Sequence, residues 1–204
     1  MSVHNVSHKP ILVGLTGGIA SGKTTALNYF KQLNLPVIDS DDIVKDLWAT
    51  NEEMIHKAES FFGFSIRSQE DLKKLAKIIF SNKKKRDKLN HIVHPYVFKH
   101  IEIEKKKYDD EQIIIIDMPL LIEAKYQSHV HYVCLVYVDL ETQLSRLMNR
   151  DPLTKEEAMK RINSQMSLEH KKEYADYIFD NTSTIDYLHH QIDKFLGGLH
   201  DEKQ

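Results

Sequence analysis

Short apolar runs are separated by longer amphipathic stretches along this 204-residue chain. Because these runs do not alternate between polar and apolar residues, they predict strands that are buried on both faces. Helical periodicity follows the first run directly, and a last helix is predicted from about Thr184 to Leu196, before a pair of glycines. The predicted strands lie at 11–16, 36–39, 112–117, 131–139 and 176–181.

The chain between the second and third predicted strands has a helical pattern. From about Asp41 to Tyr108 the apolar residues recur every three or four positions, with a turn near Gly63. Buried strands separated by helices indicate the α/β class, with a doubly wound parallel sheet of five strands. We expect a single domain, 1–204, with a core at about 9–41 and 109–200. The helices at about 42–108 are predicted to form an inserted lobe, and such a lobe can bind a second substrate.

Composition narrows the class of protein. The chain is 41% hydrophobic and 28% charged, as in soluble globular proteins, and a net charge of −2 gives no reason to expect a nucleic-acid partner. The longest apolar runs are too short to span a bilayer, and the N-terminal residues lack the order of a signal peptide. We therefore expect a cytoplasmic protein without membrane contact. Its one cysteine, Cys134, is expected to be buried, and its twelve histidines show no metal-ligand spacing.

The clearest motif is a phosphate-binding loop in "GLTGGIASGKTT" at 14–25. Gly17 and Gly22 enclose four residues and are followed by Lys23 and Thr24, which is the G-x-x-x-x-G-K-[ST] pattern between a strand and a helix. In this pattern backbone N–H groups and the helix N-terminus hold phosphate oxygens. Lys23 can reach the β- and γ-phosphates, and the Thr24 hydroxyl can ligate Mg²⁺. The motif predicts a nucleoside triphosphate and Mg²⁺.

The rest of the chain favours one class of nucleotide-binding protein. It has no N-K-x-D motif for guanine, which argues against a GTPase, and it is short for a motor ATPase. A small-molecule kinase remains the leading class.

Carboxylates at predicted strand ends are candidates for the chemistry of a kinase. Asp39 and Asp41 end the second strand, where both can face a ligand, and Asp42 is predicted to begin the next helix. The alternative is that "DSDD" only caps that helix, and capping is compatible with catalysis. Asp117 ends the third strand as a Walker-B aspartate does, which would place it near Mg²⁺, or it is a polar turn residue.

An arginine-rich segment at about 146–166 is a candidate lid. Arg146 and Arg150 share a helical face, "RDP" breaks that helix, and Thr154 can cap the next one, which contains Arg161. Such a hairpin would close on the triphosphate and stabilise charge in the transition state. The alternative is a solvated, charged hairpin.

Seven motifs occur in an order that resembles the dephospho-CoA kinase family. They span residues 14 to 181, nearly the whole chain. The resemblance implies a P-loop kinase core with a helical CoA-binding lobe and a lid. It also implies transfer of the γ-phosphate of ATP to the 3′-hydroxyl of dephospho-CoA, the last step of coenzyme A biosynthesis. The motifs are "GLTGGIASGKTT", "VIDSD", "HP" at 94–95, "PLLIEA" at 119–124, "RD" at 150–151, "RINSQ" at 161–165 and "ADYIFDN" at 175–181.

The resemblance also implies roles for individual residues. Asp41 would be the catalytic base, and Lys23, Arg146 and Arg150 would act on the transferring phosphate. From the loop motif and the end of the third strand, we expect Thr24 and Asp117 to hold Mg²⁺. The residues expected to bind ATP are Gly17, Gly18, Ile19, Ala20, Ser21, Gly22, Lys23, Thr24, Thr25 and, near the adenine, Asn181. The residues expected at the acceptor are Thr16, Asp39, Asp41, His94, Leu120, Leu121, Glu123 and Arg161.

The chain departs from the family pattern at a few positions. Ala20 stands where a glycine is usual, Ser40 where an alanine is usual, and Ile122 where a phenylalanine is common. The segment "SIRSQEDLKKLAKIIF" lacks the common DGxLxR stretch, for which Arg67, Lys73 or Lys74 would substitute. Two other interpretations stay open: a nucleoside or nucleotide kinase of the same fold, and a regulatory nucleotide-binding protein without turnover. The sequence carries no signal for an oligomeric state.

Overall fold

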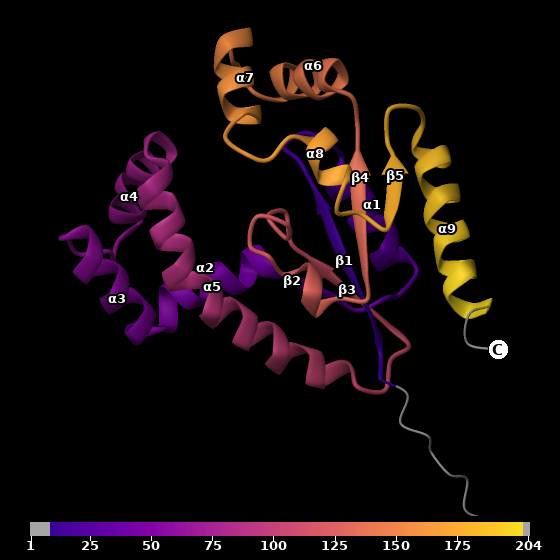
Figure 1. Ribbon diagram of the computed structural model, residues 1–204, viewed down its shortest axis with the longest axis horizontal. Helices are drawn as coiled ribbons and strands as arrows, with labels where there is room; N and C mark the ends of the chain where they lie inside the picture. Colours follow the sequence, from indigo (N-terminus) through magenta and orange to yellow (C-terminus); the bar gives the residue numbers. More distant parts are fainter. Residues whose placement is uncertain (1–8, 202–204) are drawn as a thin grey trace, which may run out of the picture. The chain divides into compact units, whose positions relative to one another are not determined.

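The computed structural model describes residues 9–201 (Figure 1). Residues 1–8, most of the segment in which we looked for a signal peptide, lie outside the described residues. The elements are β1 (Ile11–Gly17), α1 (Lys23–Gln32), β2 (Val37–Asp39), α2 (Ser40–Thr50), α3 (Glu52–Phe62), α4 (Gln69–Ser81), α5 (Lys83–Lys105), η1 (Lys106–Tyr108), β3 (Ile113–Asp117), η2 (Gln127–His129), β4 (Tyr132–Tyr137), α6 (Leu140–Arg150), α7 (Lys155–Ile162), α8 (Leu168–Lys172), β5 (Tyr177–Asp180) and α9 (Ile185–Asp201).

The five predicted strands form one sheet in the order β2-β3-β1-β4-β5. β1 pairs in parallel with β3 on one side and with β4 on the other, and β4 pairs in parallel with β5. The non-consecutive order means that helical crossovers join neighbouring strands, as in a doubly wound sheet. The predicted α/β class and parallel sheet are confirmed.

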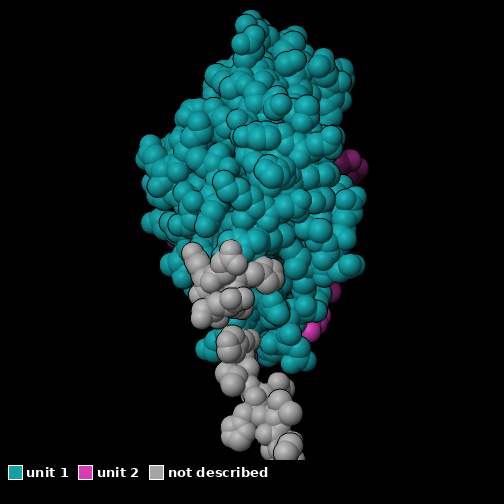
Figure 2. Space-filling model, turned by 90° about the vertical axis from the view of Figure 1, so that its right-hand side faces the viewer, with its two compact units in different colours: residues 1–37, 108–204 teal, residues 38–107 magenta. Residues whose placement is uncertain are grey.

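The chain divides into two compact units, residues 1–37 with 108–204, and residues 38–107 (Figure 2). The first unit contains β1, α1 and the elements from β3 onward, including the phosphate-binding loop. The second contains the helices from α2 to α5.

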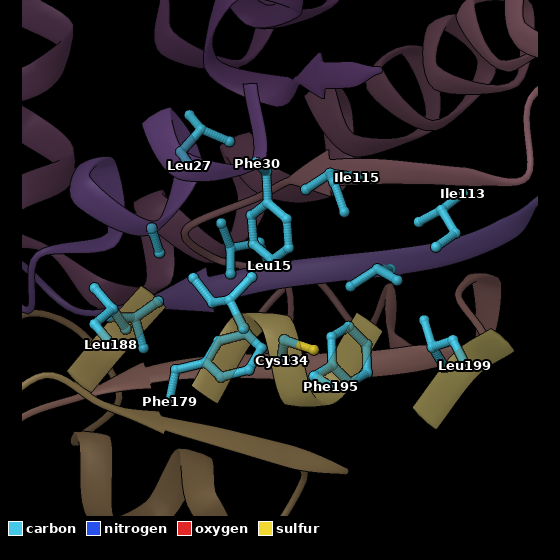
Figure 3. Packing of buried hydrophobic residues seen from close by; sticks show 14 residues of the cluster. Leu15, Leu27, Phe30, Ile113, Ile115, Cys134, Phe179, Leu188, Phe195 and Leu199 are labelled. Atoms are coloured by element: carbon cyan, nitrogen blue, oxygen red, sulfur yellow. The ribbon is translucent and has the colours of Figure 1, made fainter. Parts of the chain in front are cut away.

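One face of the sheet packs against α1 and α9 (Figure 3). Phe30 from α1, Phe179 from β5 and Phe195 from α9 meet in this core, with ring centroids 5.7 to 6.3 Å apart in successive pairs. Burial of each such ring stabilises the fold by about 1.5–3 kcal/mol. Cys134 is buried in the same cluster, as predicted, and burial raises the pKa of its thiol.

The opposite face of β4 packs against the short helix α8. Leu135 alternates with Cys134 along the strand, so its side chain points to the other face, where it packs with Val138 and with Leu168 of α8. This contact fixes α8 beneath the start of the phosphate-binding loop, because an added Cβ at Gly18 would lie 3.2 Å from the Leu168 side chain.

The unit of residues 38–107 is a bundle in which α5 contacts α2, α3 and α4. Gly63 ends α3 with a φ of 75°, which confirms the predicted turn. The Arg67 guanidinium bonds to Glu52 at 2.6 Å and to Glu59 at 3.0 Å, and Lys74 lies over the Phe64 ring. Two of the three cations that were expected to replace the DGxLxR contacts therefore already have partners within the lobe.

Two predicted helix boundaries were wrong. α2 begins at Ser40 rather than Asp42, because the Asp39 carboxylate accepts hydrogen bonds from the backbone N–H groups of Asp41 and Asp42. The last helix runs through the glycine pair to Asp201 instead of ending at Leu196. Each helical glycine costs about 1 kcal/mol relative to alanine, and burial of Leu199 against the sheet offsets that cost.

No helix among residues 9–201 is long and apolar enough to cross a membrane.

Candidate active site

The phosphate-binding loop joins β1 to α1, and the helix begins at Lys23 without a side-chain cap. The first turn of α1 contains no acidic residue. The backbone N–H groups of Lys23 and Thr24 therefore have neither an intrahelical acceptor nor a carboxylate cap, and the positive end of the helix dipole adds to them. This arrangement suits an anion with several oxygens, such as a phosphate chain.

Gly22 has no room for a side chain. Its φ is 86°, in the left-handed region, and an added Cβ would lie 2.0 Å from the Asn181 side-chain nitrogen. Asn181 is buried and donates from that nitrogen to the Ser21 carbonyl at 2.9 Å. Asn181 was expected near the adenine; the structure gives its side chain a partner in the phosphate-binding loop.

Two glutamines hold the tip of the loop. Gln143 on α6 is buried and donates to the Ile19 carbonyl at 2.7 Å, and the Ile19 N–H donates to Gln165 at 3.1 Å. Sequence analysis did not single out either side chain, although Gln165 lies within the "RINSQ" motif. The position of Gln143 on the apolar face of an amphipathic helix could have indicated its role. An amide on that face is buried, and buried amides are almost always hydrogen-bonded.

The loop lysine forms an ion pair at the end of β3. Lys23 donates to the buried Asp117 carboxylate, while the Thr24 side chain in the first turn of α1 is exposed. The two residues that were expected to hold Mg²⁺ thus differ in surroundings. No three His, Cys, Asp or Glu side chains gather into a metal site within residues 9–201.

A fully buried lysine lies beneath the loop. Lys171 on α8 donates to the carbonyls of Gly17 at 3.0 Å and Pro119 at 2.8 Å, and pairs with Glu123 at 3.1 Å. Burial lowers the pKa of Lys171, and the Glu123 carboxylate opposes that shift. Sequence analysis missed this residue, because "LEHKKEYAD" reads as an exposed charged stretch.

The residues expected at the acceptor from β1 and the "PLLIEA" segment differ in exposure. Thr16 is buried and donates to the Pro119 carbonyl at 2.9 Å. Leu121 is fully buried against Gly14, where an added Cβ would lie 2.4 Å from it. Leu120 is 37% exposed, so it is the leucine of this pair whose side chain is open to a ligand.

The arginines of the candidate lid have different partners. Arg146 is half-buried and donates to the Asn181 carbonyl at 2.9 Å, so it lies beside a residue that holds the loop. Arg150 and Arg161 both pair with Asp151, at 3.0 and 2.8 Å. Thr154 caps α7 together with Glu157, as predicted. The residues of this hairpin also pack with Ile19 and Ala20 of the loop.

Three expected site residues belong to the unit of residues 38–107. Asp39 uses its carboxylate to cap α2, and Asp41 lies exposed in the first turn of that helix. The expectation that Asp41 continues the strand two residues after Asp39 was therefore wrong, because Asp41 is helical. His94 on α5 stacks on Phe98, and burial lowers the pKa of its imidazole.

A parallel sheet that presents a braced phosphate-binding loop at the N-terminus of a helix is the arrangement of the P-loop kinases. These enzymes transfer phosphate from a nucleoside triphosphate to a small-molecule acceptor. The profile of the dephospho-CoA kinase family matches residues 11–186, and the chain belongs to this family.

The similarity extends over most of the chain. A dephospho-CoA kinase from Arabidopsis thaliana is 40% identical over 190 residues, covering 91% of this chain and 82% of the relative. One from Bacillus cereus (strain ZK / E33L) is 42% identical over 180 residues, covering 86% and 90%. Dephospho-CoA kinase from Campylobacter jejuni has a TM-score of 0.66 at 27% identity, with 95% and 98% covered. TT1252 from Thermus thermophilus has a TM-score of 0.78 at 28% identity, with 94% and 99% covered.

Ala20 gives a test of the loop conformation. Its φ is 57°, in the left-handed region, where an alanine costs about 1–2 kcal/mol and a β-branched residue costs more. We expect Ala20→Gly to keep turnover within about threefold of the unmodified enzyme, since glycine adopts this conformation freely. Ala20→Val should lower turnover by at least about tenfold, because about 1.4 kcal/mol of strain suffices for that loss.

Steady-state kinetics of both variants check this expectation. Ala49→Val, at an exposed position in α2, is the matched control for the same substitution without a left-handed backbone. Equal turnover in Ala20→Val and Ala49→Val would contradict a fixed left-handed residue in the loop.

Proposed function

We propose that this enzyme transfers the γ-phosphate of ATP to the 3′-hydroxyl of dephospho-CoA, forming coenzyme A and ADP. The observation that carries the proposal is the braced phosphate-binding loop with Lys23 at its end, in a chain of the dephospho-CoA kinase family. The loop accounts for the donor, and the family accounts for the acceptor.

The donor is bound by charge and by backbone amides. The N–H groups at the start of α1 donate hydrogen bonds to the phosphate oxygens. The Lys23 ammonium stabilises the negative charge that grows on the β- and γ-phosphates. Lys23 pairs with Asp117 in the structure, so the lysine exchanges part of this contact for phosphate when ATP binds. Arg146 is the arginine that we propose for the transferring phosphate, because Arg150 and Arg161 already share Asp151.

Mg²⁺ is proposed as the metal that accompanies ATP. The Thr24 hydroxyl and the Asp117 carboxylate would hold it, since this ion prefers oxygen ligands and usually takes only one or two from the protein. When bound, the ion would neutralise charge on the phosphate oxygens.

The acceptor hydroxyl needs a base and a fixed direction. A ribose hydroxyl is a poor nucleophile at neutral pH, and it must lose its proton as the new P–O bond forms. We assign this proton to the Asp41 carboxylate. The neighbouring Asp39 carboxylate is already engaged as the cap of α2, where it accepts hydrogen bonds from two backbone N–H groups.

The lobe of residues 42–108 is proposed to bind the rest of the acceptor. Lys73 is the candidate for its phosphate groups, because the Arg67 guanidinium is already bonded to Glu52 and Glu59. We place the enzyme in the cytoplasm, without a nucleic-acid partner.

An acceptor panel tests the proposed function. ATP is incubated with dephospho-CoA, nucleosides and nucleoside monophosphates, and phosphorylated products and ADP are quantified. We expect dephospho-CoA to be phosphorylated at least about 10²-fold faster than any other acceptor, which is a difference of about 2.7 kcal/mol in the barrier. Lys23→Ala should reduce this rate by about 10²-fold or more, as does loss of other electrostatic stabilisers.

A preferred nucleoside or nucleotide acceptor would make the chain a different kinase of the same fold. ADP release that does not depend on any acceptor would favour a regulatory nucleotide-binding protein.

Asp41→Asn tests the assignment of the base. Asparagine keeps the shape and can accept a hydrogen bond, but it cannot take the proton. We expect ATP affinity, measured by titration, to stay within a few-fold, and turnover to fall by roughly 10²- to 10⁴-fold, the usual span for a general base.

The same exchange at Asp46, which lies exposed on the same helix, is the matched control and should leave both quantities unchanged. Loss of ATP affinity in proportion to the loss of rate would assign Asp41 to the metal instead. An unchanged rate would leave "VIDSDD" as a helix cap.

A further inference from the structure

Lys171 is a buried cation that the proposed chemistry does not use. Its side chain is fully buried, although lysine is almost never buried completely unless it is paired. It lies on α8, a helix of five residues. The partners of its ammonium are far away in the sequence: Gly17 is separated by 154 residues and Pro119 by 52. These contacts replace the water that would otherwise solvate the ammonium.

The first partner is the carbonyl at the start of the phosphate-binding loop. Because the peptide bond is planar and trans, the direction of the Gly17 carbonyl also sets the direction of the Gly18 N–H. Lys171 holds that carbonyl at 3.0 Å on one side of the peptide, and the Gly18 N–H points to the Ser21 hydroxyl at 3.3 Å. One lysine contact therefore orients the first peptide plane of the loop.

The other partners belong to the segment that follows β3. The Pro119 carbonyl accepts from Lys171 and from the Thr16 hydroxyl, so the start of this segment is tied to β1. Glu123 faces Lys171 with Oε2 in an ion pair that lacks hydrogen-bond geometry, and its Oε1 accepts from the Met166 N–H at 3.2 Å. The exposed Leu120 lies between these two anchored residues.

We propose that Lys171 is a positioning residue that holds the phosphate-binding loop and the segment of residues 119–124 in a fixed relation, with Glu123 as its counter-charge. The role in the reaction rests on the proposed function, since segment 119–124 is expected to border the acceptor. Transfer requires the acceptor oxygen to lie in line with the γ-phosphate, and a displacement of about 1 Å can cost on the order of 10²-fold in rate. A single cation that binds both segments keeps such an error small.

The experiment compares the unmodified enzyme with Lys171→Met/Glu123→Gln, in which both buried charges are removed together. The paired exchange avoids leaving a lone buried carboxylate, which would destabilise the fold. Lys171→Met alone is the second variant. Lys172→Met is the matched control, because Lys172 lies next in the chain and pairs with Glu169 at the surface. The measurements are the denaturation midpoint, the dissociation constant of ATP, and the ADP formed per phosphorylated dephospho-CoA.

We expect the double variant to fold, to bind ATP about tenfold more weakly and to lose roughly 10²-fold in kcat at saturating substrates. ADP formed per product should rise several-fold, because a misplaced acceptor lets water compete for the γ-phosphate. If Lys171 only stabilised the fold, its removal would lower phosphate transfer to dephospho-CoA and to water in proportion. The ratio of ADP to phosphorylated product would then stay unchanged. Lys172→Met should match the unmodified enzyme in every measurement.

A double variant with unchanged ATP affinity and an unchanged product ratio would overturn the proposal. If the double variant does not fold and Lys171→Met does, the ATP affinity and the product ratio of Lys171→Met test the proposal in the same way. ATP titration needs no acceptor, so it tests the hold on the loop even if the unmodified enzyme does not phosphorylate dephospho-CoA. Failure of the unmodified enzyme to phosphorylate dephospho-CoA would contradict the proposed function, but it would not contradict the role of Lys171 in the loop.

Discussion

Backbone N–H groups bind a phosphate chain well only if the peptide planes that carry them already point inward. A glycine-rich loop has little ability to fix these planes by itself, because each glycine has wide conformational freedom. In this protein the side chains of four residues outside the loop supply the constraint. They reach Gly17, Ile19 and Ser21, and they are Gln143, Gln165, Lys171 and Asn181. These bonds fix backbone groups of three loop residues.

The candidate lid takes part in the same constraint. The α6–α7 hairpin packs its apolar residues on Ile19 and Ala20, and α6 also carries Gln143 and Arg146. Movement of the hairpin would therefore change the loop as well as the position of the arginine. This coupling gives a physical reason why the residues after β4 matter for a loop that ends at Gly22.

The sequence predicted what depends on local pattern. Apolar runs revealed the five strands, and the spacing of Gly17, Gly22 and Lys23 revealed the phosphate-binding loop, because both signals lie within a few residues. It did not reveal Lys171, whose burial depends on carbonyls 52 and 154 residues away. It offered capping of the next helix by "DSDD" only as an alternative and did not single out Asp39 as the cap, since the choice between strand end and helix cap is made by the fold around it. The roles of the individual site residues remain predictions that the variants above test.

These contacts imply that the loop has its binding shape before ATP binds. Amide hydrogen exchange of the nucleotide-free enzyme tests it most directly, read at Ile19, whose N–H donates to Gln165. We expect this amide to exchange at least about 10²-fold more slowly than in an unstructured peptide, and Gln165→Ala to remove most of that protection. Exchange at the unstructured rate until ATP is added would contradict a preformed loop, because ATP itself would then order it.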